Sequence, residues 1–116
     1  RRYSMTALDR AKQVATLLDN KKAQEIKVLH IGTLTSIGDY FVVATGGSTT
    51  QVKALADEIE TKLSADGLTP KRIEGYNSAS WILMDYYDVI VHIFLKETRE
   101  FYALERLWSD APIVEF

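Results

Sequence analysis

The chain has no cysteine, and this absence removes several kinds of site at once. Disulfide bridges, thiolate nucleophiles and zinc–thiolate centres all depend on cysteine side chains, so the sequence excludes them. A chain of 116 residues, 47% of them hydrophobic, is long enough to bury a core without such cross-links. A reducing environment is compatible with this composition, and we expect a cytoplasmic protein.

The chain also lacks a strong excess of either charge. It has 14 lysine and arginine residues and 16 aspartate and glutamate residues, which leaves a formal net charge of −2. Proteins that bind a phosphate backbone usually carry a basic patch. We therefore expect no direct, sequence-specific binding of nucleic acid, whereas a basic protein partner fits the composition.

Long apolar runs are missing as well. No stretch approaches the roughly 20 apolar residues that a helix needs to cross a bilayer, so we expect no membrane association. The first ten residues, RRYSMTALDR, contain arginines but no apolar segment behind them, which argues against a signal peptide. We expect residues 1–5 to be a disordered arm or a cloning remnant outside the fold.

The spacing of hydrophobic residues predicts a single α/β domain over residues 1–116. The predicted elements are a helix at 7–20, strands at 25–31 and 39–45, a helix from Ser48 to about Gly67, a short strand at 71–75, two strands within 78–94 and a last helix capped by Thr98. The order α-β-β-α-β-β-β-α indicates a mixed five-stranded sheet flanked by helices. The last helix should turn Phe101, Leu104, Leu107 and Trp108 inward, and the tail 110–116 should run irregularly over the surface.

Gly46 and Gly47 precede a predicted helix, where free backbone amides can bind phosphate. The segment lacks the lysine of a Walker loop and the third glycine of the dinucleotide fingerprint. Ser48 and Gln51 instead have the spacing of a capping box. We interpret the glycine pair as a tight turn before a capped helix, and we predict no cofactor.

Two aspartates in the apolar segment 78–94 invite a comparison with nucleotidyltransferases, which hold metal ions between carboxylates on one face of a strand. Asp85 and Asp88 are three residues apart. In a continuous strand they would point to opposite faces, and in a hairpin they would lie at its two matching ends. We therefore predict no metal site, and an enzyme that uses Ser48, Asp85 and Asp88 is kept only as an alternative.

The two histidines do not form a catalytic motif. His92 lies among aliphatic and aromatic residues, and no serine or cysteine pairs with it by spacing. We interpret His92 and His30 as hydrogen-bonded structural residues. Without a nucleophile–base pair, the sequence predicts no catalytic residue and no enzyme.

Trp81 begins a predicted strand directly after a polar segment. It is either a core residue or an aromatic anchor in a protein interface, where tryptophan and tyrosine are enriched, and the residues alone leave both interpretations open. An interface centred on Trp81 would include Glu74, Tyr76, Ile82, Leu83, Asp85, Tyr86, Tyr87 and Asp88. Such an aromatic and acidic patch suits a partner rich in lysine and arginine.

Three blocks of the sequence resemble, in order and spacing, the signature blocks of the ribosomal silencing factor family, also known as the Iojap-like family. They are LTSIGDYFVVATGGSTTQVKALAD at 34–57, EGYNSASWILMDYYDVIVHIF at 74–94 and REFYALERLW at 99–108. The resemblance extends from about Ala7 to Pro112. It places a family motif on Glu74, Gly75 and Trp81, and it suggests that Arg99 and Glu105 anchor the last helix.

This resemblance implies a non-enzymatic translation factor, built on a sheet related to nucleotidyltransferases without their active site. Family members are described as binding the large ribosomal subunit through its ribosomal protein number fourteen, on the face that meets the small subunit. Occupying that face blocks subunit joining and represses translation when nutrients are limiting. Organelle relatives act in large-subunit assembly, and free members are often homodimers, which we also expect for this chain.

The sequence departs from the family pattern at two positions. Tyr87 replaces a glycine that usually follows the equivalent of Tyr86, so a positive φ at this turn would be strained. Thr50 stands where an arginine is common in the family, so this chain lacks any contact that the arginine side chain makes.

Overall fold

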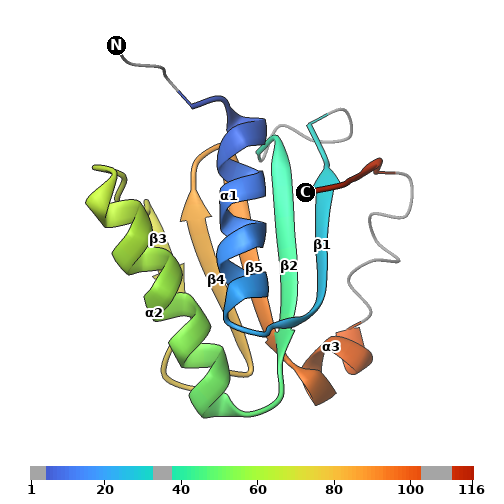
Figure 1. The fold of residues 1–116 in the computed structure, drawn as a ribbon. Coiled ribbons are helices and arrows are strands. Elements are labelled where there is room, and N and C mark those ends of the chain that lie inside the picture. The colour runs from blue at the N-terminus through green and yellow to red at the C-terminus, as the bar shows by residue number, and fades with distance from the viewer. Residues whose placement is uncertain (1–4, 33–37, 103–110) are drawn as a thin grey trace.

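The computed structural model describes residues 5–32, 38–102 and 111–116, which form a mixed sheet with helices packed against it (Figure 1). In chain order the elements are α1 (Ala7–Asn20), β1 (Gln24–His30), β2 (Tyr40–Gly46), α2 (Thr49–Ala65), β3 (Arg72–Glu74), β4 (Trp81–Tyr86), β5 (Val89–Leu95), α3 (Lys96–Tyr102) and β6 (Ile113–Val114). The strand order in the sheet is β3-β4-β5-β2-β1-β6. Strands β2 and β5 are parallel and the other pairs are antiparallel, which confirms the predicted mixed α/β arrangement.

Both long helices begin at a side-chain cap. In α1 the Thr6 hydroxyl accepts a hydrogen bond from the Asp9 amide at 3.0 Å, and the Asp9 carboxylate accepts one from the Thr6 amide at 3.3 Å. In α2 the Ser48 hydroxyl accepts from the Gln51 amide at 3.1 Å, as predicted. The reciprocal bond differs from the predicted capping box, because the Gln51 side chain accepts from the Gly47 amide instead.

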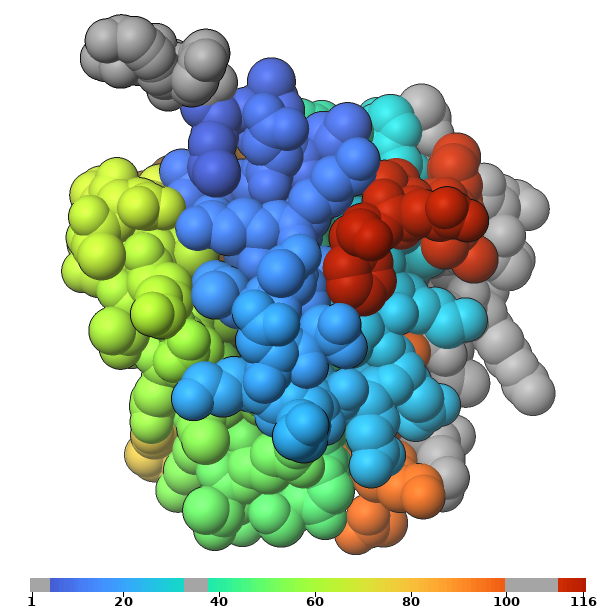
Figure 2. Space-filling model, viewed as in Figure 1, coloured from blue at the N-terminus to red at the C-terminus, as the bar shows by residue number. Residues whose placement is uncertain are grey.

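Helices α1 and α2 lie side by side across one face of the sheet, which we call the first face (Figure 1). The apolar stripe of α2 predicted from its spacing is buried against it, namely Val52, Leu55, Ala56, Ile59 and Leu63. This packing forms the larger core cluster, which also contains Val42, Val91 and Ile93 from the sheet. In the space-filling view the two helices and their side chains cover most of this side of the molecule (Figure 2).

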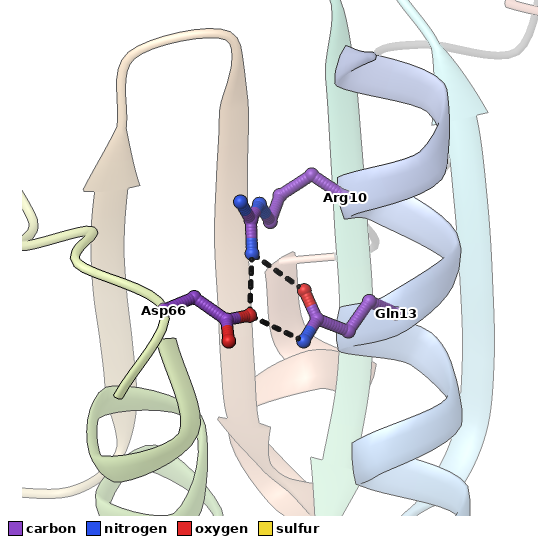
Figure 3. Close-up of polar contacts among 3 residues, drawn as sticks. All are labelled: Arg10, Gln13 and Asp66. Atoms are coloured by element: carbon purple, nitrogen blue, oxygen red, sulfur yellow. Dashed lines mark hydrogen bonds and ion pairs between the residues drawn. The ribbon is translucent and has the colours of Figure 1, made fainter. Parts of the chain in front are cut away.

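A small polar network joins the two helices at the end of α2 (Figure 3). The Arg10 guanidinium donates to the Asp66 carboxylate at 3.1 Å and to the Gln13 side-chain oxygen at 2.8 Å. The Gln13 amide nitrogen also donates to the Asp66 carboxylate at 3.1 Å. These hydrogen bonds lower the pKa of Asp66 below its ordinary value of 3.8, with the bond from Gln13 as the larger cause.

The sheet face turned away from α1 and α2, here called the second face, carries a separate and smaller core. Because successive side chains of a strand alternate between faces, neighbouring residues of β4 belong to different cores. The second cluster consists of Leu29, Ile31, Phe41, Val43, Ile90, Phe94 and Ala111, with Trp81 and Leu83 packed against it. Residues that are adjacent in β4 therefore cannot belong to one surface.

The sheet has six strands rather than the predicted five. Residues 113–114, for which the sequence predicted an irregular path, pair with β1 through Ile113 opposite Leu29 and Val114 opposite Val28. Without this pairing, one side of β1 would present unpaired backbone donors and acceptors. Two β-branched residues after Pro112 are well suited to extended structure and complete that edge.

Helix α3 begins at Lys96, directly after β5, so Thr98 lies inside the helix and the predicted cap is wrong. The predicted anchoring role of Arg99 is confirmed, because its guanidinium donates to the Glu25 carbonyl at 2.6 Å and to the Thr45 hydroxyl at 2.8 Å. These bonds connect α3 to β1 and β2. The predictions for Leu104, Glu105, Leu107 and Trp108, and for the side chain of Phe101, lie outside the described part of the chain.

Candidate protein-docking surface

The segment 78–94 forms a β-hairpin whose turn consists of Tyr87 and Asp88. The pairing places Tyr86 opposite Val89 and, further along, Trp81 opposite Phe94. Tyr87 has φ +71°, a left-handed conformation that two-residue hairpin turns require and that glycine adopts most easily. The strain foreseen for a tyrosine at this turn is therefore present. The Asp85 carboxylate stabilises the turn by accepting a hydrogen bond from the Tyr87 amide at 2.9 Å.

Trp81 is half-buried on the second face. It is therefore neither a fully buried core residue nor a fully exposed interface anchor, the two interpretations that the sequence left open. Its indole N–H donates to His92 Nδ1 at 3.0 Å, and its ring lies 4.8 Å from the Phe94 ring. His92 is 4% exposed, and this burial lowers its pKa to about 4. The prediction that His92 is a hydrogen-bonded structural residue is confirmed, and its partner is the proposed anchor itself.

A tight backbone approach brings the end of β3 beside Trp81. Gly75 has φ +80°, and a Cβ at this position would overlap the Trp81 carbonyl oxygen. Glycine is thus required both for the conformation and for the space. A shallow groove of about 270 Å³ results, lined by Glu74, Gly75, Trp81 and Leu83.

Charged side chains surround this groove. The Arg72 guanidinium lies 2.9 Å from the Glu74 carboxylate and 3.7 Å from the Asp85 carboxylate, which is largely buried. We call the group Arg72, Glu74, Trp81, Leu83 and Asp85 the β3–β4 surface. Sequence reasoning missed Arg72. This residue lies directly opposite Asp85 in the strand register, and it shares one face of β3 with Glu74, two residues further along.

Three of the predicted interface residues lie elsewhere. Ile82 is 0% exposed and Tyr86 is 4% exposed, and both point into the first core. Burial raises the pKa of the Tyr86 phenol to about 12. The Tyr76 hydroxyl donates to the Asp57 carboxylate of α2 at 3.0 Å, so its ring lies beside that helix. Strand alternation along β4 separates Ile82 and Tyr86 from Trp81 and Leu83, whereas Tyr76 lies in the turn between β3 and β4.

Tyr87 and Asp88 are exposed, but they stand at the far end of the hairpin from Trp81. Tyr87 follows Trp81 by six positions along the extended chain, a span of roughly 20 Å. Tyr87 is 56% exposed and lines a hollow with Met5 and Arg10 at the start of α1. The predicted surface therefore has two parts, the β3–β4 surface and the hairpin turn.

The residues of the nucleotidyltransferase alternative do not converge. Tyr40, at the start of β2, pairs with Val89, and Gly46, at its end, pairs with Leu95. Ser48 follows the end of β2, whereas Asp88 precedes Val89, so the length of a strand separates them. Within the described ranges, no group of three or more histidine, cysteine, aspartate or glutamate side chains is arranged to hold a metal ion. None of the helices in those ranges has the length and apolar character needed to span a membrane.

Comparison with known proteins agrees with the sequence resemblance. Residues 4–116 match the family model described as ribosomal silencing factor during starvation. The chain is 43% identical over 98 residues to ribosomal silencing factor RsfS of Halalkalibacterium halodurans, covering 84% of each chain. It is 39% identical over 104 residues to the protein of the same name in Bacillus subtilis, covering 90% of this chain and 88% of that one.

A more distant relative and a solved structure extend this comparison. Mitochondrial assembly of ribosomal large subunit protein 1 from Mus musculus is 31% identical over 101 residues, which cover 83% of this chain and 43% of that one. A crystal structure of a Chromobacterium violaceum protein superimposes with a TM-score of 0.87 at 37% identity. That superposition covers 90% of this chain and 88% of the other.

Proposed function

The chain belongs to the ribosomal silencing factor family, and we propose that it binds the large ribosomal subunit and prevents the small subunit from joining. The proposed contact is ribosomal protein number fourteen, on the face of the large subunit that meets the small one. Translation would then be repressed under nutrient limitation. The match over residues 4–116 carries this proposal.

The chemistry of the β3–β4 surface supports a basic protein partner. Trp81 and Leu83 offer partly exposed apolar area, and tryptophan is among the residues that supply most of the energy in protein interfaces. Within the β3–β4 surface, the carboxylates of Glu74 and Asp85 outnumber the guanidinium of Arg72. A lysine- or arginine-rich surface would meet complementary charge there.

The proposed mechanism requires no bond-making step. A 13.1 kDa protein on the intersubunit face excludes the small subunit by its volume, provided that it stays bound. A standard interface buries about 800 Å² on each partner, with a few anchors dominating the affinity. No catalytic residue and no cofactor enter this proposal.

Sedimentation of purified bacterial large and small subunits, with and without the protein, tests the proposal. We expect the protein to co-sediment with large subunits and to reduce the fraction of joined ribosomes. Trp81→Ala should lose both effects while remaining folded by circular dichroism. Tyr76→Ala is the matched control, because Tyr76 is close in sequence but lies beside α2, and it should behave as the unmodified protein. Equal behaviour of the two variants would exclude the β3–β4 surface as the contact.

The relative named for large-subunit assembly favours a second candidate function, a role in maturation of the large subunit. Binding alone does not separate the two functions, since both require the large subunit. Depletion of the protein in growing cells does. Accumulation of incomplete large subunits during rapid growth would favour assembly, whereas excess joining only in starved cells would favour silencing.

Two further expectations need their own measurements. Sedimentation equilibrium tests the expected homodimer, and a Trp81→Ala variant that becomes monomeric would place Trp81 in the dimer contact. Calorimetric titration with ATP and Mg²⁺ tests the nucleotidyltransferase alternative that uses Ser48, Asp85 and Asp88. We expect no heat of binding in that titration.

A further inference from the structure

The hydrogen bond between Trp81 and His92 determines how each ring is arranged. His92 Nδ1 is the acceptor, at 3.0 Å from the indole nitrogen. A neutral imidazole with an accepting Nδ1 carries its proton on Nε2. Among the described residues, His92 Nε2 has no hydrogen-bond partner. The hydrogen bond to Trp81 is thus the polar interaction that the structure assigns to this buried ring.

An apolar side chain would otherwise suit position 92 better. His92 lies within the strand VIVHIFL and contacts Phe41, whose ring centroid is 4.6 Å from its own. A buried polar group with an unsatisfied hydrogen-bonding atom lowers stability. Leucine or phenylalanine at position 92 would bury well but would offer no hydrogen-bond acceptor to the indole of Trp81.

We propose that His92 is a positioning residue for Trp81, which holds the indole in the orientation that the docked partner requires without touching the partner. The tilted contact between the Trp81 and Phe94 rings is a dispersion contact, which does not fix the direction of the indole N–H. The hydrogen bond is directional and turns the indole N–H toward the sheet. This inference depends on the proposed function, because it concerns the anchor of that docking surface.

The same hydrogen bond narrows the chemistry of the partner. The indole N–H is already bonded inside the protein, so the partner need not supply an acceptor to it. The aliphatic stem or the charged end of a lysine or arginine, laid against the ring, fits this requirement. Such a side chain also agrees with the excess of carboxylates around the groove.

Loss of the positioning bond should weaken binding without abolishing it. Ordering a side chain that is mobile before binding costs affinity, here about threefold to tenfold for one indole. His92→Leu removes the acceptor at similar volume, and we expect that loss in titrations with purified bacterial large ribosomal subunits. His92→Asn keeps an oxygen near the position of Nδ1 and should restore the affinity to within about twofold of the original, because the acceptor is regained.

A double-mutant cycle separates positioning from a general structural role. Trp81→Phe removes the indole donor while keeping an aromatic ring. If His92 acts through Trp81, His92→Leu should have no additional effect on binding in the Trp81→Phe background. An equal loss in both backgrounds overturns the proposal.

The orientation of the indole has a readout that does not involve the ribosome. In ¹⁵N-labelled protein, the indole N–H signal of Trp81 is the one that disappears in Trp81→Phe. We expect it to exchange slowly with solvent, to shift upfield and exchange faster in His92→Leu, and to recover in His92→Asn. An unchanged signal in His92→Leu overturns the proposal.

Two further variants serve as controls, one for a failure to fold and one for the proposed docking surface. Should His92→Leu not fold, His92→Phe supplies a second variant without an acceptor. A folded variant of either kind that binds with unchanged affinity overturns the positioning role, while weaker binding by Trp81→Ala still supports the docking surface. If Trp81→Ala binds as the unmodified protein does, the docking surface is wrong and the positioning role falls with it.

Discussion

The two faces of the sheet are built from the same strands but differ in chemistry. The first face meets α1 and α2 through aliphatic side chains such as Val42, Leu55 and Ile93, which form the larger cluster. The second face carries Phe41, Trp81 and Phe94, together with the buried polar side chain of His92. The first face is arranged to be covered by helices of the same chain, whereas the second presents aromatic and charged groups at its β3–β4 edge.

This difference shows that residues adjacent in the sequence need not lie on the same surface. Ile82 and Leu83 are neighbours in the chain, yet one lies in the first core and the other beside Trp81. Because side chains alternate along β4, one residue is buried in the core and contributes to stability, while the next is partly exposed and available for contact with a partner. Substitutions in such neighbouring pairs can test the comparison directly.

The largest expected effect comes from the pair Ile82→Ala and Leu83→Ala. Ile82 is fully buried, so its truncation should lower the free energy of unfolding by about 2–5 kcal/mol through lost burial and a cavity. Leu83 is only partly buried, and its truncation should cost about 1 kcal/mol. Urea unfolding measures both values. Equal losses of stability would contradict the division between the faces, as would weaker large-subunit binding by folded Ile82→Ala than by Leu83→Ala.

A second effect concerns acid stability and the buried His92. Its pKa is lowered to about 4 in the folded protein, whereas an unfolded chain binds this proton near the ordinary value of 6.5. The unfolded state therefore takes up a proton first as pH falls. The stability associated with a neutral His92 is complete above pH 6.5 and is lost toward pH 4, by on the order of 3 kcal/mol.

The matched variant for this effect is His92→Asn, which cannot titrate in that range. Urea unfolding at pH 7 and pH 4.5 should show a smaller loss of stability in acid for His92→Asn than for the unmodified protein. Equal losses in the two proteins would mean that His92 is not the responsible group.

A smaller effect should appear at the hairpin turn. Tyr87 has φ +71°, and Tyr87→Gly should raise the free energy of unfolding by about 0.5–1 kcal/mol, because relief of strain exceeds the added entropy of the unfolded chain. Removal of this exposed ring should at the same time weaken large-subunit binding if the turn belongs to the interface. Asp88→Gly is the control, since Asp88 has no positive φ and should become slightly less stable. A loss of stability in both variants would show that the turn is not strained at Tyr87.

The smallest effect concerns the polar contacts that join α1 to the end of α2 outside the core. Hydrogen bonds from Gln13 and Arg10 lower the pKa of Asp66, so the charged form stabilises the folded state above pH 3.8 and the benefit is lost as pH falls through the lowered pKa. Asp66→Asn should unfold at a slightly lower temperature at pH 7. That difference should vanish below the lowered pKa, where Asp66 is also uncharged. A difference that persists in strong acid would point to shape rather than charge.

Much of the fold could be predicted because its signals are local. The buried stripe of α2 follows from helical spacing, and the Ser48 cap follows from one hydroxyl at the correct distance from Gln51. The turn at Tyr87 could be located because the family pattern usually has glycine there. In each case the physical cause lies within a few residues, so no knowledge of distant contacts was required.

The candidate site was less predictable because it depends on pairing between distant segments. Arg72 joins the surface only through its register with Asp85, and His92 meets Trp81 only across the hairpin. Once the two-residue turn is known, counting outward from Tyr86 and Val89 brings Trp81 and His92 close together. The family pattern located the turn but not the strand register on either side of it, so the contact between Trp81 and His92 was not predicted.

The tail illustrates the same limit at the edge of the sheet. Residues 113–114 are too short to signal a strand, and they become one because β1 has an open edge beside them.

Residue identity and short-range spacing were enough to predict the family, the positions of the long helices and the main strands, and the absence of cysteine chemistry. Which residues of β4 face the helices and which lie beside Trp81 became clear only from the folded sheet. The folded sheet also determined that a buried histidine bonds the indole and that an arginine joins the carboxylates. These outcomes follow from strand register, a long-range property set by how the whole sheet pairs.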